Sequence, residues 1–183
     1  MSEQDGIICA YVFDGKGGAR ELSTWDDVLA AQARQEFVWT HLQLENERAR
    51  AWLTGAAGLE PAVASALLND EPRPRCDVHD TGLIVCLRGV NLNHGADPED
   101  MVSVRLWLEE RRAITVRRRT LMAINDIRGD IARGAGVKTA GAFLADLAGK
   151  LVARMGPVIA DLDDRVDELE DVLLTGPSRE IRT

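Results

Sequence analysis

TAGAFLADLAGKLVARMGPVIADLDDRVDELEDVLLT, residues 139–175, shows the clearest periodic pattern in the chain. Its apolar residues recur at steps of three and four, a spacing that places them on one face of an α-helix. The series is Phe143, Leu147, Leu151, Met155, Val158, Leu162, Val166, Leu169 and Leu173. The pattern predicts one long amphipathic helix with a coiled-coil-like seam over residues 137–175.

Upstream of this helix, strand and helix signals alternate. Short runs rich in β-branched and aromatic residues predict strands at 7–13, 19–22, 37–42, 82–92, 102–108 and 113–117. Helix signals lie at 25–33, 46–53, 61–68 and 121–131. The strand at 82–92 is too continuously apolar to lie at the edge of a sheet. Residues 1–136 therefore predict an α/β domain, in which residues 69–80, with two prolines, form a polar loop.

Composition excludes several classes of protein. Of the 183 residues, 45% are hydrophobic and 28% charged, which is typical of a globular rather than a disordered chain. The formal net charge of −8 argues against a nucleic-acid-binding function, which needs an excess of Lys and Arg. Three widely spaced cysteines without a signal peptide are typical of a reduced, intracellular protein. No run approaches the ~18–20 apolar residues of a membrane span.

The acidic segment, residues 161–171 (DLDDRVDELED), carries the strongest chemical signal. It holds seven acidic residues and one arginine, and therefore a formal charge of −6. Like-charge pairs at i,i+4 on a helix each cost ~0.2–0.5 kcal/mol, and these acids also lie toward the negative end of the helix dipole. Divalent cations, or a basic surface on another subunit, would compensate the repulsion. A solvated acidic face, screened by salt, is the simpler alternative.

Other groups of residues carry weaker signals. Cys76 and His79 have the spacing of half a structural zinc site, but no second pair matches them, which favours plain loop residues. His94 lies beside three acids in the loop at 93–100, and we expect this segment to be a polar turn rather than a metal site. No nucleophile–base set is recognisable, which argues against an enzyme.

The hairpin region is rich in arginine. It lacks the interleaved aromatic residues of a nucleic-acid-binding surface, and the domain as a whole is acidic. We therefore expect its arginines to pair with acids of the sheet or of the long helix. They are Arg105, Arg111, Arg112, Arg117, Arg118 and Arg119.

A series of short motifs occurs in a distinctive order along the chain. They are Asp14-Gly15-Lys16-Gly17-Gly18, Trp39-Thr40-His41-Leu42, Arg73-Pro74-Arg75, Leu87-Arg88-Gly89-Val90-Asn91, Val116-Arg117-Arg118-Arg119 and the run from Leu162 to Asp171. In this order they resemble the cytoplasmic domain of the ZntB zinc transporters, within the CorA magnesium-channel superfamily. The resemblance covers residues 6–182, and the series of motifs carries it rather than any single one.

This resemblance implies an α/β/α sandwich with a mixed sheet, followed by a stalk helix that leads to two membrane helices. Five subunits would form a funnel on the cytoplasmic side of the bacterial inner membrane, with the cation on its axis. Residues 176–183 would start a further helix, and the chain would be truncated before its membrane spans and the family's pore motif. The protein would transport Zn²⁺ or Mg²⁺ as a homopentamer, with no organic cofactor and no nucleic-acid partner.

On this interpretation the acidic segment collects cations along the inner wall of the funnel, and metal occupancy biases subunit packing and hence the gate. The residues expected to bind the metal are Asp163, Asp164, Asp167, Glu170 and Asp171. The alternative is a free-standing soluble oligomerisation or protein-interaction module. In that case the acids match a basic partner and metals have no role.

Overall fold

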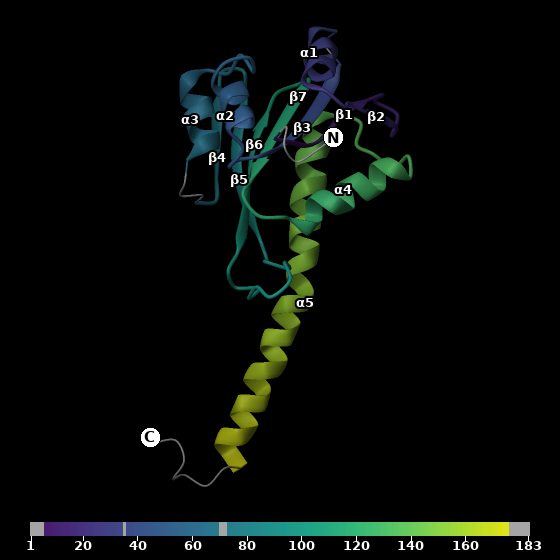
Figure 1. Cartoon of the computed structure of the whole chain (residues 1–183). Helices are drawn as coiled ribbons and strands as arrows, with labels where there is room; N and C mark the ends of the chain where they lie inside the picture. Colours follow the sequence, from purple (N-terminus) through teal and green to yellow (C-terminus); the bar gives the residue numbers. More distant parts are fainter. Residues whose placement is uncertain (1–5, 35, 70–72, 176–183) are drawn as a thin grey trace.

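The computed structural model describes residues 6–34, 36–69 and 73–175, and the predicted helix start at 176–183 lies outside them. In the described part, seven strands form one sheet and five helices accompany it (Figure 1). The strands are β1 (Ile7–Phe13), β2 (Ala19–Glu21), β3 (Phe37–Gln43), β4 (Arg75–His79), β5 (Gly82–Gly89), β6 (Val102–Leu108) and β7 (Arg112–Arg117). The helices are α1 (Trp25–Ala33), α2 (Glu47–Thr54), α3 (Pro61–Leu68), α4 (Met122–Ala132) and α5 (Ala140–Thr175).

The sheet is mixed, as predicted. Its strand order is β2-β1-β3-β7-β6-β5-β4, and β3 runs parallel to β7 while the other neighbours are antiparallel. The parallel pair aligns Trp39 with Ala113 and Gln43 with Arg117, so the carboxyl ends of both strands meet at one end of the sheet. β5 lies between β6 and β4, which confirms that this apolar strand is not at an edge.

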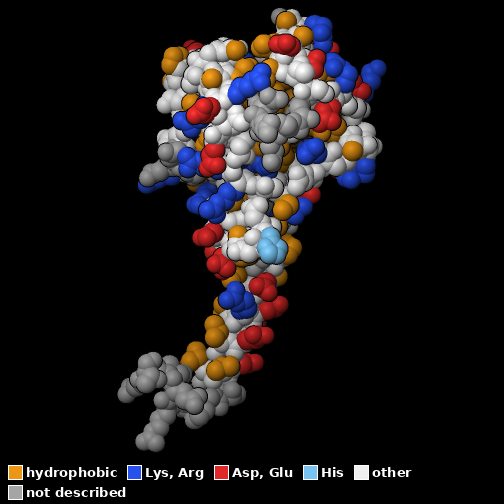
Figure 2. Space-filling view, in the orientation of Figure 1, with side chains coloured by type: hydrophobic (Ala, Val, Ile, Leu, Met, Phe, Trp, Pro, Cys, Tyr) orange, Lys and Arg blue, Asp and Glu red, His pale blue; other side chains and the backbone are white. Residues whose placement is uncertain are grey.

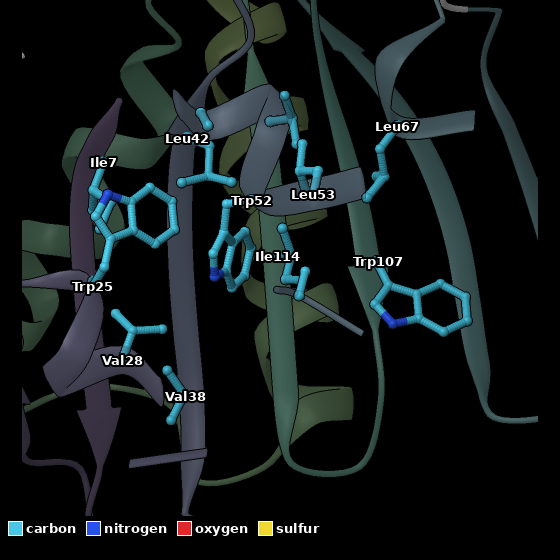
Figure 3. Packing of buried hydrophobic residues seen from close by; sticks show 14 of the residues in the cluster. Ile7, Trp25, Val28, Val38, Leu42, Trp52, Leu53, Leu67, Trp107 and Ile114 are labelled. Atoms are coloured by element: carbon cyan, nitrogen blue, oxygen red, sulfur yellow. The ribbon is translucent and has the colours of Figure 1, made fainter. Parts of the chain in front are cut away.

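The first face of the sheet is covered by α1, α2 and α3. Their apolar residues pack on side chains of β1, β3 and β7, and the rings of Trp25 and Trp52 lie 4.9 Å apart (Figure 3). Local signals set where the helices begin, because Thr24 and Asp27 form a capping box at α1 and the Asn46 side chain caps α2. The apolar residues of all three helices are therefore buried in one core.

The opposite face is covered by α4 and the first part of α5. Phe143, Leu147 and Leu151, each one helical turn apart, are buried against the sheet. At Gly89 a Cβ atom would lie 2.7 Å from Leu151 Cδ2, so α5 approaches β5 closely at a position without a side chain. Helices cover both faces of the sheet, and the predicted α/β/α sandwich is confirmed.

The prediction of a polar loop over residues 69–80 is wrong in its second half. Arg75–His79 form β4, which pairs antiparallel with β5 from Arg75 opposite Cys86 to His79 opposite Gly82. β4 is an edge strand, and edge strands tolerate polar and charged side chains without an apolar run. Cys76 and His79 are thus strand residues. The next strand, β5, ends at Gly89 rather than at Leu92.

A small polar cluster is buried on the face covered by α4 and α5. Trp39 Nε1 donates a hydrogen bond to Thr115 Oγ1 (2.7 Å), and His41 Nδ1 lies 2.8 Å from the same oxygen. The Thr115 hydroxyl therefore has its own proton to donate to a neutral His41 ring. Burial, helped by the positive charge of Arg117, lowers the pKa of His41 to about 3, and burial raises the pKa of the Cys9 thiol to about 12. Both groups are uncharged at neutral pH.

Candidate functional site

The second half of α5 extends beyond the α/β body (Figure 1). The helix has 36 residues, which corresponds to a length of about 54 Å at 1.5 Å per residue, and it continues through Pro157. From Ile159 to Leu174 every side chain except the half-buried Leu162 is exposed. All five acids predicted to bind metal lie on this protruding half.

These five residues, Asp163, Asp164, Asp167, Glu170 and Asp171, form what we call the acidic surface, and all of them are exposed. On a helix with 3.6 residues per turn, Asp163, Asp167, Glu170 and Asp171 lie within about 100° of arc, and Asp164 lies about 20° beyond its edge. Figure 2 shows acidic side chains following one side of the protruding helix. The carboxylates therefore present one continuous negative surface to solvent.

An apolar surface runs beside the acidic surface on the same half of α5 (Figure 2). It is formed by Ile159, Val166, Leu169 and Leu173, whose exposed fractions lie between 52% and 64%. These positions span about 80° of arc, next to the acids. A row of exposed branched aliphatic side chains is unfavourable in water, so this surface favours contact with another apolar surface.

Within one chain, the carboxylates do not form a closed metal site. Among the described residues, no three His, Cys, Asp or Glu side chains lie together in a way that would hold a metal ion. Cys76 is exposed on β4, and His79 packs edge-on against the Trp107 ring at 5.8 Å, away from the acidic surface. In a single chain the acidic surface is a diffuse field of negative charge rather than a set of converging ligands.

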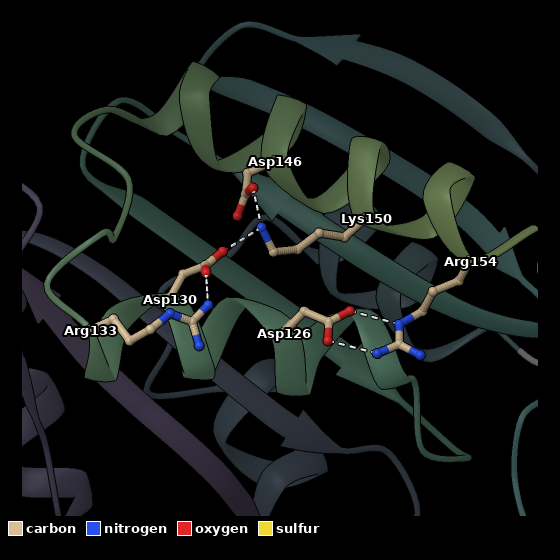
Figure 4. Close-up of polar contacts among 6 residues, drawn as sticks. All are labelled: Asp126, Asp130, Arg133, Asp146, Lys150 and Arg154. Carbon is tan, nitrogen blue, oxygen red and sulfur yellow. Dashed lines mark hydrogen bonds and ion pairs between the residues drawn. The ribbon is translucent and has the colours of Figure 1, made fainter.

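Ion pairs between α4 and α5 attach the long helix to the body (Figure 4). Arg154 donates two hydrogen bonds to Asp126, from Nε to Oδ2 and from Nη2 to Oδ1, both at 2.6 Å. Lys150 lies 2.6 Å from Asp130 of α4 and also pairs with Asp146, one turn earlier on α5. Hydrogen bonds from Arg154 and Lys150 hold the pKa values of Asp126 and Asp130 below the usual range, so both are ionised at neutral pH.

Sequence reasoning did not identify these attachment residues. Asp146 and Lys150 are spaced i,i+4, which is a readable signal for a pair on one helix. Asp126 and Arg154 lie 28 residues apart on different helices, and only the packing of α4 on α5 brings them together.

Replacing Asp126 with asparagine should weaken the attachment of α5. The variant keeps the shape of the side chain but leaves Arg154 facing a neutral amide. Both side chains are about one-third exposed (35% and 34%), so screening by solvent limits the expected loss of unfolding free energy to about 1 kcal/mol. Urea unfolding of D126N, R154Q and the double variant measures the coupling energy. A coupling energy near zero would show that the pair does not hold α5.

The arginines of the hairpin region have mixed partners. Arg112 forms an ion pair with Glu109 (2.7 Å), in the turn between β6 and β7, and donates to the carbonyl of Ala57. Arg105 donates to the backbone carbonyl of Asn69. Arg112 thus pairs with an acid, but this acid lies in the turn and not, as was predicted, in the sheet or the long helix. Through Ala57 and Asn69, Arg112 and Arg105 connect the sheet to the layer of α2 and α3.

A mixed sheet covered on both faces and followed by a long acidic helix also matches known proteins. The family described as CorA-like Mg²⁺ transporter protein matches residues 34–183, which include α5 and most of the sheet. This chain belongs to the CorA-like Mg²⁺ transporter family. That family is one of cation transporters and not of enzymes, which agrees with the sequence-based prediction.

Two curated relatives of the CorA-like chain are themselves described as transporters of divalent metals. The divalent cation transporter CmaX of Pseudomonas aeruginosa is 37% identical over 172 residues, which cover 93% of this chain and 52% of CmaX. The zinc transport protein ZntB of Pectobacterium carotovorum subsp. carotovorum is 31% identical over 172 residues, which cover 94% of this chain and 51% of that ZntB. The chain spans about half the length of the curated relatives it matches.

Solved structures confirm the fold of the CorA-like chain. Full-length CmaX superposes with a TM-score of 0.84 at 38% identity, over 92% of this chain and 52% of CmaX. The cytoplasmic domain of ZntB from Vibrio parahaemolyticus superposes with a TM-score of 0.76 at 24% identity, over 89% of this chain and 64% of that domain. Among the residues that the structure describes, no helix has the length and apolar character needed to span a bilayer.

Proposed function

We propose that this chain is the cation-collecting domain of a divalent cation transporter, on the cytoplasmic side of the bacterial inner membrane. Its family and its similarity to CmaX and ZntB support a role in divalent cation transport. The observation that carries the proposal is the acidic surface, five exposed carboxylates on a helix that extends beyond the body. Zn²⁺ or Mg²⁺ is the substrate in this role, and no organic cofactor takes part.

The charge density of the acidic segment would enrich divalent ions more strongly than monovalent ions. Its seven carboxylates and one arginine lie along 11 residues, or about 16 Å of helix, comparable to the Debye length of ~10 Å at 0.1 M salt. Surface potentials of several kT are typical of such charge clusters. A potential of about −2 kT per unit charge enriches a monovalent cation roughly 7-fold and a divalent cation roughly 50-fold, because the charge enters the exponent.

Association of several chains would concentrate this field further. We propose that copies of the chain associate through the apolar surface, as a homopentamer in the full-length protein. Neighbouring acidic surfaces would then face a common axis, and carboxylates from different subunits would supply the converging ligands that one chain lacks. Occupied sites would favour one packing of the subunits over another and so bias the gate.

The proposal predicts that neutralising Asp163, Asp167 and Asp171 together in the full-length protein slows cation uptake. Removing three of the seven carboxylates weakens the local potential, so uptake at subsaturating Zn²⁺ or Mg²⁺ should fall roughly three- to tenfold at low ionic strength. The loss should shrink at high salt and at saturating cation. Uptake into vesicles that contain the purified D163N/D167N/D171N variant measures this effect.

A matched control removes three exposed acids from the body instead, as E21Q/D26N/E47Q. This variant has the same net charge but keeps the acidic surface, and its uptake should stay close to that of the unmodified protein. Unchanged uptake and unchanged metal affinity in D163N/D167N/D171N would reject the cation-collecting role. That outcome would favour a protein-interaction module, which the exposed apolar surface of α5 would also suit.

A further inference from the structure

A pocket opens where the carboxyl ends of β3 and β7 meet. Its volume is about 580 Å³, and its lining includes Gln43 at the end of β3 and Arg117–Thr120 at the end of β7. The loop after β5 reaches the same place and contributes Asn91 and Asn93. In sheets with parallel strands, ligands bind preferentially outside the carboxyl ends of the strands. The volume is in the range typical of sites for small molecules.

The lining of this pocket is strongly positive. The described residues that line it include three consecutive arginines, Arg117, Arg118 and Arg119, and no acidic side chain. Arg118 and Arg119 are exposed, whereas Arg117 is buried. Gln43 Nε2 donates to the carbonyl oxygen of Arg118 (2.9 Å), which holds this part of the chain at the mouth of the pocket. Arginine clusters of this kind suit phosphate oxygens, which accept several hydrogen bonds from a guanidinium fork.

A second, independent observation also indicates a missing acceptor. Asn91 lines the pocket and is only 1% exposed. Its Oδ1 accepts hydrogen bonds from the backbone N and from Nδ2 of Asn93, at 3.3 and 2.7 Å. These bonds orient the amide, and its Nδ2 group is then buried with no hydrogen-bond partner among the described residues. A buried N–H donor without an acceptor is unfavourable, and an oxyanion in the pocket would supply that acceptor.

We propose that this pocket binds the phosphate group of a small anionic ligand. Arg118 and Arg119 would contact the phosphate from the open side, and the Asn91 amide would donate to it from the buried side. The site lies on the α/β body, away from the acidic surface of α5, and its ligand has the opposite charge to a transported cation. A CorA-like chain would thus carry a separate anion site at the end of its sheet.

Titration calorimetry of the 183-residue chain with inorganic phosphate and with AMP tests the proposal, at constant ionic strength set with sodium chloride. Saturable binding of one molecule per chain is expected for at least one of these probes. The R118Q/R119Q variant, which changes only exposed side chains, should bind it at least tenfold more weakly. The Asn91→Asp variant keeps the size of the buried side chain but places a negative charge in the pocket, and it should lose binding while circular dichroism shows a folded chain.

The control variant R20Q/R34Q removes two exposed arginines elsewhere and should bind the probe within twofold of the unmodified chain. Absence of saturable binding for both probes would overturn the proposal. Equal weakening in R118Q/R119Q and R20Q/R34Q would also overturn it, because it would show attraction by net charge alone. Undiminished affinity in both R118Q/R119Q and folded Asn91→Asp would exclude this pocket as the site.

Discussion

Replacing Phe143 with alanine is expected to lower the free energy of unfolding by about 3–5 kcal/mol. The Phe143 side chain is fully buried, with its ring 5.1 Å from that of Trp39 and 6.4 Å from that of Phe37. Alanine removes these contacts and leaves a cavity between α5 and the sheet, which rigid strands cannot collapse to fill. Urea unfolding of the 183-residue chain, followed by tryptophan fluorescence, measures the loss.

Val152→Ala is the matched control for this prediction, because Val152 lies on the same helix but is 65% exposed. Its effect on unfolding should stay within about 0.5 kcal/mol. Similar losses for Phe143→Ala and Val152→Ala would mean that the first turns of α5 are not packed in the core. The contrast therefore tests whether the face of α5 that carries Phe143 is packed against the sheet while the opposite face is open to solvent.

Acidification from pH 6.5 to pH 4.5 should lower the free energy of unfolding through His41 alone, with a slope that rises toward about 1.4 kcal/mol per pH unit in the lower part of this interval. Burial, assisted by the positive charges of Arg117 and Arg128, lowers the pKa of His41 from 6.5 to about 3 in the folded chain. In this pH interval the unfolded chain binds a proton at His41 and the folded chain does not, so protons favour unfolding. The stability that depends on a neutral His41 is therefore fully present above pH 6.5 and is lost as the pH falls toward 3.

Two variants isolate this effect when the free energy of unfolding is measured against pH. His41→Gln should flatten the slope between pH 6.5 and 4.5, while His94→Gln, in an exposed loop, should keep it. Asp126 and Asp130 contribute little to the slope in this interval, because the stability that comes from their lowered pKa values is lost mainly as the pH falls through 3.8 and below. NMR titration gives a check that does not depend on the stability of the variant. A native-state pKa of His41 near 6.5 would contradict the prediction.

Both predictions concern the packing interface between the sheet and α5, which also matters for the proposed function. Phe143, Leu147 and Leu151 anchor α5 through apolar contacts, and the Asp126–Arg154 pair anchors it through charge. The acidic surface lies farther along the same uninterrupted helix. Because the helix is continuous, the position of the acidic surface relative to the body depends on these anchors.

Elements with a strong local pattern were predictable from the sequence. The apolar period of α5, the capping residues of α1 and α2, and the continuous apolar run of β5 each lead to the observed element. The strand β4 was missed because an edge strand needs no apolar pattern. Its residues became a strand through pairing with β5, a contact that propensity does not encode.

The two candidate sites also differ in how far the sequence predicts them. The acidic surface was predictable, because helical periodicity alone places Asp163 and Asp167 on one face of a single element. The pocket at the ends of β3 and β7 was not, because Gln43, Asn91 and Arg117 come from distant segments. The hydrogen bonds that orient Asn91 and leave its amide unpaired arise only from the folded loop after β5.

The order and spacing of neighbouring residues were enough to predict most elements of this protein, its family resemblance and the charge of its long helix, but not the edge strand β4. Tertiary structure alone decided which turns of α5 are buried and which protrude, since that depends on where Phe143 meets the sheet. It also decided that Asp126 meets Arg154 and that three arginines line a pocket beside a buried amide. These features need segments far apart in the chain to pack together, and the long-range contacts that join them have no counterpart in local sequence.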